Sequence, residues 1–316
     1  MQKNDLRMTR TVLTTTSSFA KDLSEVIEPL QSAEINLICN PYGRTLSQSE
    51  LNGLLEKYRP VGLLAGNEKI DRATLEMSTG YLRVISRVGV GWDNIDRDAA
   101  QELGIRVYRT EGVLADAVAE LTMGLILSAL RHICLQDQLM KQGKWQKQMG
   151  SLLKDKTIGI IGFGTIGRRI GELAKAFGCT VIFYDAVQIS VPWADSVNLS
   201  ELLERAHIIT LHASGKSKII DHEMLTRLGK EGVVIVNTAR GNLIDEAALC
   251  RGLLDGRIGY ACLDVFENEP YDGPLCKLNN VILTPHIGSY AHEARQQMER
   301  FAVEQLLDGL RKATVI

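Results

Sequence analysis

The sequence predicts an α/β protein with two domains, each built around a doubly wound parallel sheet. Its length of 316 residues suits two domains, because a single domain typically has about 100–200 residues. Short runs of β-branched residues alternate with helical patterns along the whole chain, as in parallel sheets whose strands are joined by helices. With 45% hydrophobic residues, the chain can bury a sizeable core.

Five candidate strands precede a long helix in the first part of the chain. The helix should run from about Ala117 to Gln142. Val118, Leu121 and Leu125 recur within it at helical spacing, and Gly143 is a suitable residue to end it. The strands are expected at Thr11–Thr15, Ile35–Cys39, Gly62–Ala65, Val84–Val88 and Arg106–Tyr108.

A second series of strands and helices begins at Thr157 and ends in a helix over His292–Leu310. Its alternation again indicates a doubly wound sheet. Its strands are expected at Thr157–Ile161, Thr180–Tyr184, Ile208–Leu211, Val233–Asn237, Ala261–Asp264 and Val281–Leu283.

The composition argues against several classes of function. The formal charge is −2 and the basic residues are scattered, so we expect no nucleic-acid partner. The most apolar helical stretch, Ala117–Leu130, contains Glu120 and is too short to cross a membrane. The polar N-terminal residues are unlike a signal peptide, so a cytoplasmic location is the default expectation. The six cysteines form no CxxC pair, and we expect them to be reduced, with no metal site.

A glycine-rich turn follows the first strand of the second series. Gly162, Gly164 and Gly167 form a GxGxxG pattern between an apolar strand and an amphipathic helix, the context of a dinucleotide-binding turn. The first glycine makes the tight turn, the second lets a pyrophosphate approach, and the third lets the helix pack on the strand. The helix N-terminus offers N–H groups to the phosphates. The alternative is a tight turn without a ligand.

Asp185 follows Gly167 by 18 residues, at the end of the next strand. This spacing is close to the roughly 20 residues expected for the acid that binds the ribose. Its carboxylate can bind both ribose hydroxyls and would repel a 2′-phosphate, and the following AVQIS contains no Arg or Lys. The sequence therefore predicts NAD rather than NADP. Arg168 is either a phosphate contact or a surface residue.

Charged side chains follow three strands of the second series. Arg240 and His286 each come just after a strand, while Asp264 lies in an apolar strand and Glu269 just beyond it. Ligands of open α/β sheets bind at these strand ends. A guanidinium can hold a carboxylate and polarise a carbonyl. An imidazolium can donate a proton, and a carboxylate can fix its tautomer. Taken singly, each of these residues has a simpler explanation as a surface, turn or loop residue. Together they predict hydride transfer between nicotinamide and a small 2-hydroxy or 2-oxo acid.

Over essentially its whole length the chain resembles the D-isomer-specific 2-hydroxyacid dehydrogenases. The resemblance implies a catalytic triad of Arg240, Glu269 and His286, and an Asp264 that contacts the nicotinamide amide. It also implies backbone N–H groups that bind the substrate carboxylate, in the loop of Val88, Gly89, Val90 and Gly91. The segments that carry it are RVGVGWDNID, AVAELTMGLIL, IGIIGFGTIGRRI, VNTARGNLIDEAAL, ACLDVFENEP and TPHIGS.

The same resemblance implies the domain organisation. A Rossmann-type NAD-binding domain, residues 115–289, would be inserted into a flavodoxin-like substrate domain made of residues 1–114 and 290–316. The long helix after Ala115 resembles the element through which this family dimerises, so we expect a homodimer. Further contacts to NAD are expected from Thr165, Ile166, His212 and Ala239.

Within the family, the chain resembles short 3-phosphoglycerate dehydrogenases that lack a C-terminal regulatory domain. This implies 3-phosphoglycerate or 3-phosphohydroxypyruvate as substrate, with Arg87 and Arg131 facing its phosphate. The region Ala65–Asn67 lacks the arginine that such enzymes often carry there. Either Arg44 replaces that arginine, or the substrate has no phosphate.

Two further departures from the family pattern concern loops. Trp92 stands in GVGWDN where a smaller residue is more usual, and Ser214 occupies a position where proline is usual. His212 is accordingly either a cofactor-side residue or a buried strand-end histidine. The alternative functions are a glyoxylate or hydroxypyruvate reductase and, in another class, an NAD(H)-responsive co-regulator. Formate oxidation is disfavoured by Glu269.

Overall fold

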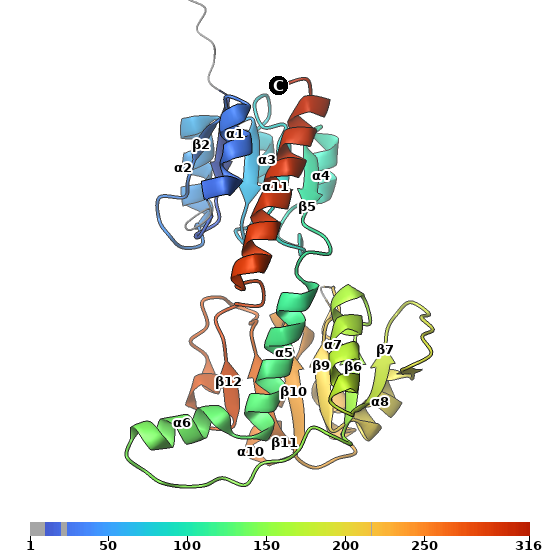
Figure 1. The fold of residues 1–316 in the computed structure, drawn as a ribbon. Coiled ribbons are helices and arrows are strands. Elements are labelled where there is room, and N and C mark those ends of the chain that lie inside the picture. Colours follow the sequence, from blue (N-terminus) through green and yellow to red (C-terminus); the bar gives the residue numbers. More distant parts are fainter. Residues whose placement is uncertain (1–9, 20–23, 216) are drawn as a thin grey trace, which may run out of the picture. The chain divides into compact units, whose positions relative to one another are not determined.

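The computed structural model describes residues 10–19, 24–215 and 217–316, which form two compact units (Figure 1). Unit 1 combines the chain up to Leu114 with Ala291–Ile316, and unit 2 comprises Ala115–Tyr290. Each unit has one sheet in which all paired strands are parallel, with helices packed against it. The predicted α/β class with two doubly wound parallel sheets is confirmed.

Unit 1 has a five-stranded sheet in the order β2-β1-β3-β4-β5. Ser47 begins α2 with a reciprocal capping box to Glu50, and α11 packs on β3, β4 and β5. The strands are β1 (Thr11–Thr14), β2 (Asn36–Ile38), β3 (Gly62–Ala65), β4 (Val84–Arg87) and β5 (Arg106–Arg109). The helices are η1 (Ser24–Val26), α1 (Glu28–Ser32), α2 (Gln48–Tyr58), α3 (Arg72–Met77), α4 (Arg97–Glu102) and α11 (His292–Lys312).

Unit 2 has a seven-stranded sheet in the order β12-β11-β10-β9-β6-β7-β8. The strand order reverses between β6 and β9, so the ends of these strands form the switch point where ligands of open sheets bind. The strands are β6 (Thr157–Ile161), β7 (Thr180–Tyr184), β8 (Asp195–Ser196), β9 (Ile208–Leu211), β10 (Val233–Asn237), β11 (Ile258–Leu263) and β12 (Val281–Leu283). The helices are α5 (Ala115–Leu130), α6 (Ile133–Lys141), α7 (Thr165–Ala176), α8 (Leu199–Arg205), α9 (His222–Thr226), η2 (Gly241–Leu243), α10 (Glu246–Leu254) and η3 (Pro274–Lys277).

The single helix predicted from Ala117 to Gln142 is wrong, because the chain breaks between α5 and α6 and bends by 64°. The carbonyl of Leu130 accepts a hydrogen bond from the N–H of Ser151 at 2.8 Å, and His132 adopts a left-handed conformation with φ 51°. In a continuing helix this carbonyl would instead accept a hydrogen bond from the next turn.

Among the described residues, no single helix is long and apolar enough to cross a membrane. The bent pair α5 and α6 passes that test by length and composition only, and much of α5 lies buried in the core of unit 2. All six cysteines are free. Within the described ranges, no group of three His, Cys, Asp or Glu side chains is placed to hold a metal ion.

Candidate active site

The glycine turn of unit 2 lies between β6 and α7. Gly162 has φ +92°, and a Cβ there would lie 2.4 Å from the backbone nitrogen of Ala213. A Cβ at Gly167 would lie 2.1 Å from the carbonyl oxygen of Gly162. Gly164 precedes α7 with open space around it and no side-chain cap. The N–H groups of the first turn, which includes Thr165 and Ile166, are therefore open to a ligand. This arrangement fits a dinucleotide pyrophosphate.

Asp185 directly follows β7, and its carboxylate is tied to the glycine turn. It accepts the N–H of Phe163 at 2.6 Å through Oδ2 and the N–H of Val187 at 2.9 Å through Oδ1. Arg168 donates from Nε to the carbonyl of Phe163 at 3.1 Å, so its side chain is fixed to the same turn. The acid thus stands beside the glycine turn, as expected for a residue that binds the ribose of NAD.

The loop after β9 borders the glycine turn through its backbone. His212 donates its N–H to the carbonyl of Ile161 at 2.7 Å, and its Nε2 lies 2.7 Å from the hydroxyl of Thr210. Burial lowers the pKa of His212 to about 3, so the imidazole is neutral. Ser214 is exposed in the same loop. A contact of His212 with the cofactor stays a prediction.

Glu269 and His286 form a hydrogen-bonded pair. His286 Nδ1 lies 2.8 Å from Glu269 Oε2, while Glu269 Oε1 accepts the N–H of Phe266 at 3.0 Å. Burial acts to raise the pKa of Glu269. The hydrogen bond and charge of His286, the Phe266 N–H and the charge of Arg240 outweigh this effect and lower that pKa below its ordinary value. The pair therefore has an ionised carboxylate on the Nδ1 side of the imidazole.

Arg240 lies in the loop between β10 and η2, close to this pair. Asn237 shapes the loop, because its side chain donates to the carbonyl of Arg240 at 2.8 Å and accepts the N–H of Ala239 at 3.0 Å. A Cβ at Gly241 would lie only 1.9 Å from the carbonyl carbon of Phe266, so the two loops are in backbone contact. The structure thus brings together the three residues predicted at the ends of β10, β11 and β12.

Asp264 has a structural role that the sequence did not reveal. It is buried just after β11, and its Oδ1 accepts the hydroxyl of Thr284 at 2.6 Å and the N–H of Ile287 at 2.8 Å. Oδ2 accepts the N–H of Gly288 at 2.8 Å. Burial raises the pKa of Asp264 despite these hydrogen bonds, which act to lower it. Asp264 therefore holds the turn that carries His286, whereas the contact with nicotinamide stays a prediction.

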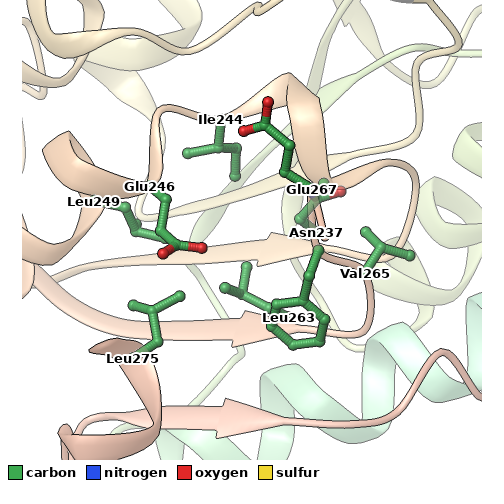
Figure 2. Close-up of a pocket in the computed structure, with 10 residues that line it drawn as sticks. Asn237, Ile244, Glu246, Leu249, Leu263, Val265, Glu267 and Leu275 are labelled. Atoms are coloured by element: carbon green, nitrogen blue, oxygen red, sulfur yellow. The ribbon is translucent and has the colours of Figure 1, made fainter. Parts of the chain in front are cut away.

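A small pocket borders the loops that carry Arg240 and Glu269 (Figure 2). It has an empty volume of about 310 Å³, which includes open solvent, and its lining is mostly apolar. Arg240, Glu269 and His286 are not among its lining residues, so we do not assign it to the substrate. The lining residues are Asn237, Gly241, Ile244, Glu246, Leu249, Leu263, Val265, Phe266, Glu267 and Leu275.

In unit 1, the predicted carboxylate-binding loop follows β4. The N–H of Val88 donates to the carbonyl of Ala65, and the N–H of Gly89 donates to the hydroxyl of Thr110, each at 2.9 Å. Among the described residues, no hydrogen bond engages the N–H of Val90 or Gly91. Two of the four predicted donors are thus committed to the fold, and the other two are available to a ligand.

The three arginines expected near a phosphate are engaged elsewhere or lie apart. Arg87 is buried and donates to the carbonyl of Val88 and, at 2.5 Å, to Asn67 Oδ1. Arg44 donates to both carboxylate oxygens of Glu50, at 2.9 and 2.6 Å.

Arg131 follows the last residue of α5. Val118, near the other end of this helix, lies beside Gly288 in the turn that carries His286. At about 1.5 Å per residue, the distance along the helix between Arg131 and Val118 is roughly 20 Å. The structure therefore does not bring Arg131 together with His286 and the other two residues of the predicted triad.

Comparisons with known proteins show the family to which the chain belongs. Residues 123–288 match the sequence profile of the D-isomer specific 2-hydroxyacid dehydrogenase, NAD binding domain. The chain is 42% identical to a D-3-phosphoglycerate dehydrogenase of Methanocaldococcus jannaschii, over 82% of this chain but only 51% of that protein. It is 38% identical to a glyoxylate reductase of Thermococcus litoralis, over 80% of this chain and 82% of that protein.

Solved structures give the same result. The TT0316 protein from Thermus thermophilus superposes with a TM-score of 0.88 at 33% identity, covering 96% of this chain and 97% of that one. A D-lactate dehydrogenase from Aquifex aeolicus, complexed with NAD and lactic acid, superposes with a TM-score of 0.82 at 26% identity, covering 96% of each chain. Three of these four relatives are named as enzymes, and none of them lends support to a co-regulator. The chain therefore belongs to the D-isomer-specific 2-hydroxyacid dehydrogenases, oxidoreductases acting on CH–OH donors, and its cofactor is NAD.

Proposed function

We propose that this protein interconverts a short, unphosphorylated 2-oxo acid, such as glyoxylate or hydroxypyruvate, and the corresponding 2-hydroxy acid. The observation that carries the proposal is the Glu269–His286 pair, held beside Arg240 in the unit that contains the glycine turn. When bound, the reduced cofactor supplies the hydride.

Each catalytic residue has a role that follows from its contacts. Since Nδ1 of His286 is taken by Glu269, Nε2 is the atom that gives the proton to the substrate oxygen. The ionised Glu269 stabilises the imidazolium and keeps the ring oriented. Arg240 binds the substrate and polarises its carbonyl group. We assign the substrate carboxylate to the N–H groups of Val90 and Gly91.

The contacts of the arginines support an unphosphorylated substrate. Arg44 and Arg87 already have partners within unit 1, Glu50 and Asn67. The phosphorylated substrate, expected first from the sequence, is the second candidate, and the 42% identity to a D-3-phosphoglycerate dehydrogenase favours it. A cytoplasmic location and the absence of nucleic-acid and membrane partners stay predictions.

A substrate panel tests this proposal. NADH oxidation is measured with glyoxylate, hydroxypyruvate and 3-phosphohydroxypyruvate, and we expect turnover of the first two. Turnover confined to the phosphorylated acid would establish the second candidate and give Arg87 a role at the phosphate. If NADH binds but none of the acids is reduced, the proposed activity is wrong.

Asp185 should set the choice of cofactor. We expect Asp185→Ser to reduce the ratio of kcat/KM with NADH to that with NADPH by about 10–100-fold, since a hydrogen bond to a charged group contributes roughly 1.5–3 kcal/mol. Asp195→Ser, which removes an exposed acid from β8 of the same sheet, is the matched control and should keep the wild-type ratio. A wild-type enzyme that prefers NADPH would contradict the assignment.

We also propose that the protein is a homodimer joined through an arm formed by residues 133–152. Helix α6 has no buried residue, and large apolar side chains of the arm are exposed, as at the centre of a subunit interface. These side chains are Ile133, Met140, Trp145, Met149 and Leu152.

Charge introduced into this arm should separate the subunits. We expect Trp145→Lys combined with Met149→Lys to halve the mass measured by light scattering, because the two side chains are 80% and 93% exposed in one chain. Leu254→Lys, at an exposed apolar residue of α10, should leave the mass unchanged. A wild-type monomer, or a variant that stays dimeric, would rule out the arm as the interface.

A further inference from the structure

Trp92 directly follows the loop that contains Val90 and Gly91, and two cations lie over its ring. The guanidinium carbon of Arg109 lies 4.1 Å from the ring centroid, and that of Arg97 lies 4.4 Å from it. Arg109 comes from the end of β5 and Arg97 from the first turn of α4. The indole is partly buried against the core of unit 1. We call Trp92, Arg97 and Arg109 the clamp.

The backbone is anchored on both sides of the two available N–H groups, but not at them. Before them, Val88 and Gly89 are held by Ala65 and Thr110, as described above. After them, the N–H of Ile95 donates to the carbonyl of Trp92 at 3.0 Å, and the N–H of Asp96 donates to the carbonyl of Ile70 at 2.9 Å. Trp92 is the nearest side chain on the C-terminal side that can fix the direction of the N–H groups of Val90 and Gly91.

We propose that Trp92 is a positioning residue for the substrate carboxylate. Contact with Arg97 and Arg109 immobilises the indole of Trp92 and thereby keeps the N–H groups of Val90 and Gly91 directed at the carboxylate. Trp92 thus determines the affinity for 2-oxo acids. The inference rests on the proposed function of this loop. Its physical basis is that a cation over an aromatic ring contributes a favourable interaction, and that a small misplacement of a binding group greatly weakens its effect.

The test compares steady-state constants of the full-length enzyme and its variants with glyoxylate. Trp92→Leu keeps an apolar contact with the core but removes the ring that the cations contact. We expect KM for glyoxylate to rise about tenfold, with kcat and KM for NADH nearly unchanged, because the carboxylate is bound equally in the ground and transition states. Trp92→Phe retains a ring and should restore much of the affinity.

The arginines provide a double-mutant cycle. Arg97→Met combined with Arg109→Met removes both cations and should raise KM to a similar extent as Trp92→Leu. Adding Trp92→Leu to this background should then have little further effect, since the three side chains act as one unit. Arg59→Met removes a cation that lies 4.7 Å from the ring centroid of Tyr81 in the same unit, and it is the matched control with an unchanged KM.

The outcomes separate the clamp from the proposed activity. If the wild type reduces glyoxylate and Trp92→Leu changes only the melting temperature, Trp92 is a packing residue and the proposal is wrong. Additive effects in the double-mutant cycle would also overturn it. If the wild type reduces no 2-oxo acid, the proposed function fails, and binding of oxamate to the NADH complex becomes the readout. A tenfold weaker affinity of Trp92→Leu for oxamate would support the clamp, whereas equal affinity, or no binding to the wild type, would overturn it.

Discussion

His286→Ala should lower kcat for reduction of a 2-oxo acid by about two to four orders of magnitude, the usual contribution of a positioned general acid. His286 is the proposed proton donor, and its Nδ1 lies 2.8 Å from Glu269 Oε2. The measurement is kcat with saturating NADH and substrate, together with the dissociation constant of NADH from a fluorescence titration. That constant should stay near the wild-type value, because His286 lies apart in sequence from the glycine turn and from Asp185.

A matched histidine variant controls for loss of a histidine in general. His222 is exposed at the start of α9 in the same unit, and His222→Ala should retain the wild-type kcat. A His286→Ala enzyme that turns over within a few-fold of the wild type would show that another group, or water, supplies the proton.

Asp264→Asn should lower kcat by about one to two orders of magnitude, although Asp264 need not touch the substrate. Asparagine can keep one acceptor for Thr284 and Ile287, but it turns an N–H₂ group toward the N–H of Gly288. The turn that carries His286 should therefore shift, and displacement of a catalytic group by about 1 Å can cost roughly 100-fold in rate. Because a buried donor loses its acceptor, the free energy of unfolding should fall by about 1–3 kcal/mol.

The pH dependence of stability provides a second readout for Asp264. Burial raises the pKa of Asp264, so the folded state binds a proton more tightly than the unfolded state at this site. The contribution of Asp264 to the free energy of unfolding is therefore greatest at pH values below the ordinary pKa of a carboxyl group. This contribution is lost as the pH rises through the raised pKa. Urea unfolding of Asp264→Asn should lack this part of the pH dependence. Asp255→Asn, at an exposed aspartate that follows α10, should retain it. Full activity of Asp264→Asn would remove the positioning role.

Much of the architecture could be predicted because most strands of the two parallel sheets are buried. Such strands appear as short β-branched runs, and β3, β6, β7, β9, β10 and β12 have the predicted bounds. The strand β8 was missed because Asp195–Ser196 is polar and has only two residues, too few for a periodic pattern. The break after α5 is accompanied by a hydrogen bond from Ser151, which lies 21 positions beyond Leu130, and no local pattern signals such a contact.

Only those features of the candidate site that depend on residue type and strand position could be predicted from the sequence. Arg240, Glu269 and His286 could be proposed because parallel strands end at one edge of their sheet. The role of Asp264 could not, because its three hydrogen bonds go to residues about twenty positions later. Nor could the sequence show that Arg44 forms an ion pair with Glu50, because the pairing of side chains depends on the path of the loop between them.

The backbone contact between Gly241 and Phe266 limits how this enzyme can be altered. Any larger residue at position 241 would push the loop of Arg240 against the loop of Glu269, so the two loops must change together. Laboratory evolution toward new substrates should therefore rarely retain substitutions at Gly241. Ser214, which is exposed in the loop after β9, is a better place for sequence diversity, whereas its neighbour Gly215 has φ +142° and should be retained. A library restricted to position 214 should yield a larger share of folded, active variants than one that includes Gly241.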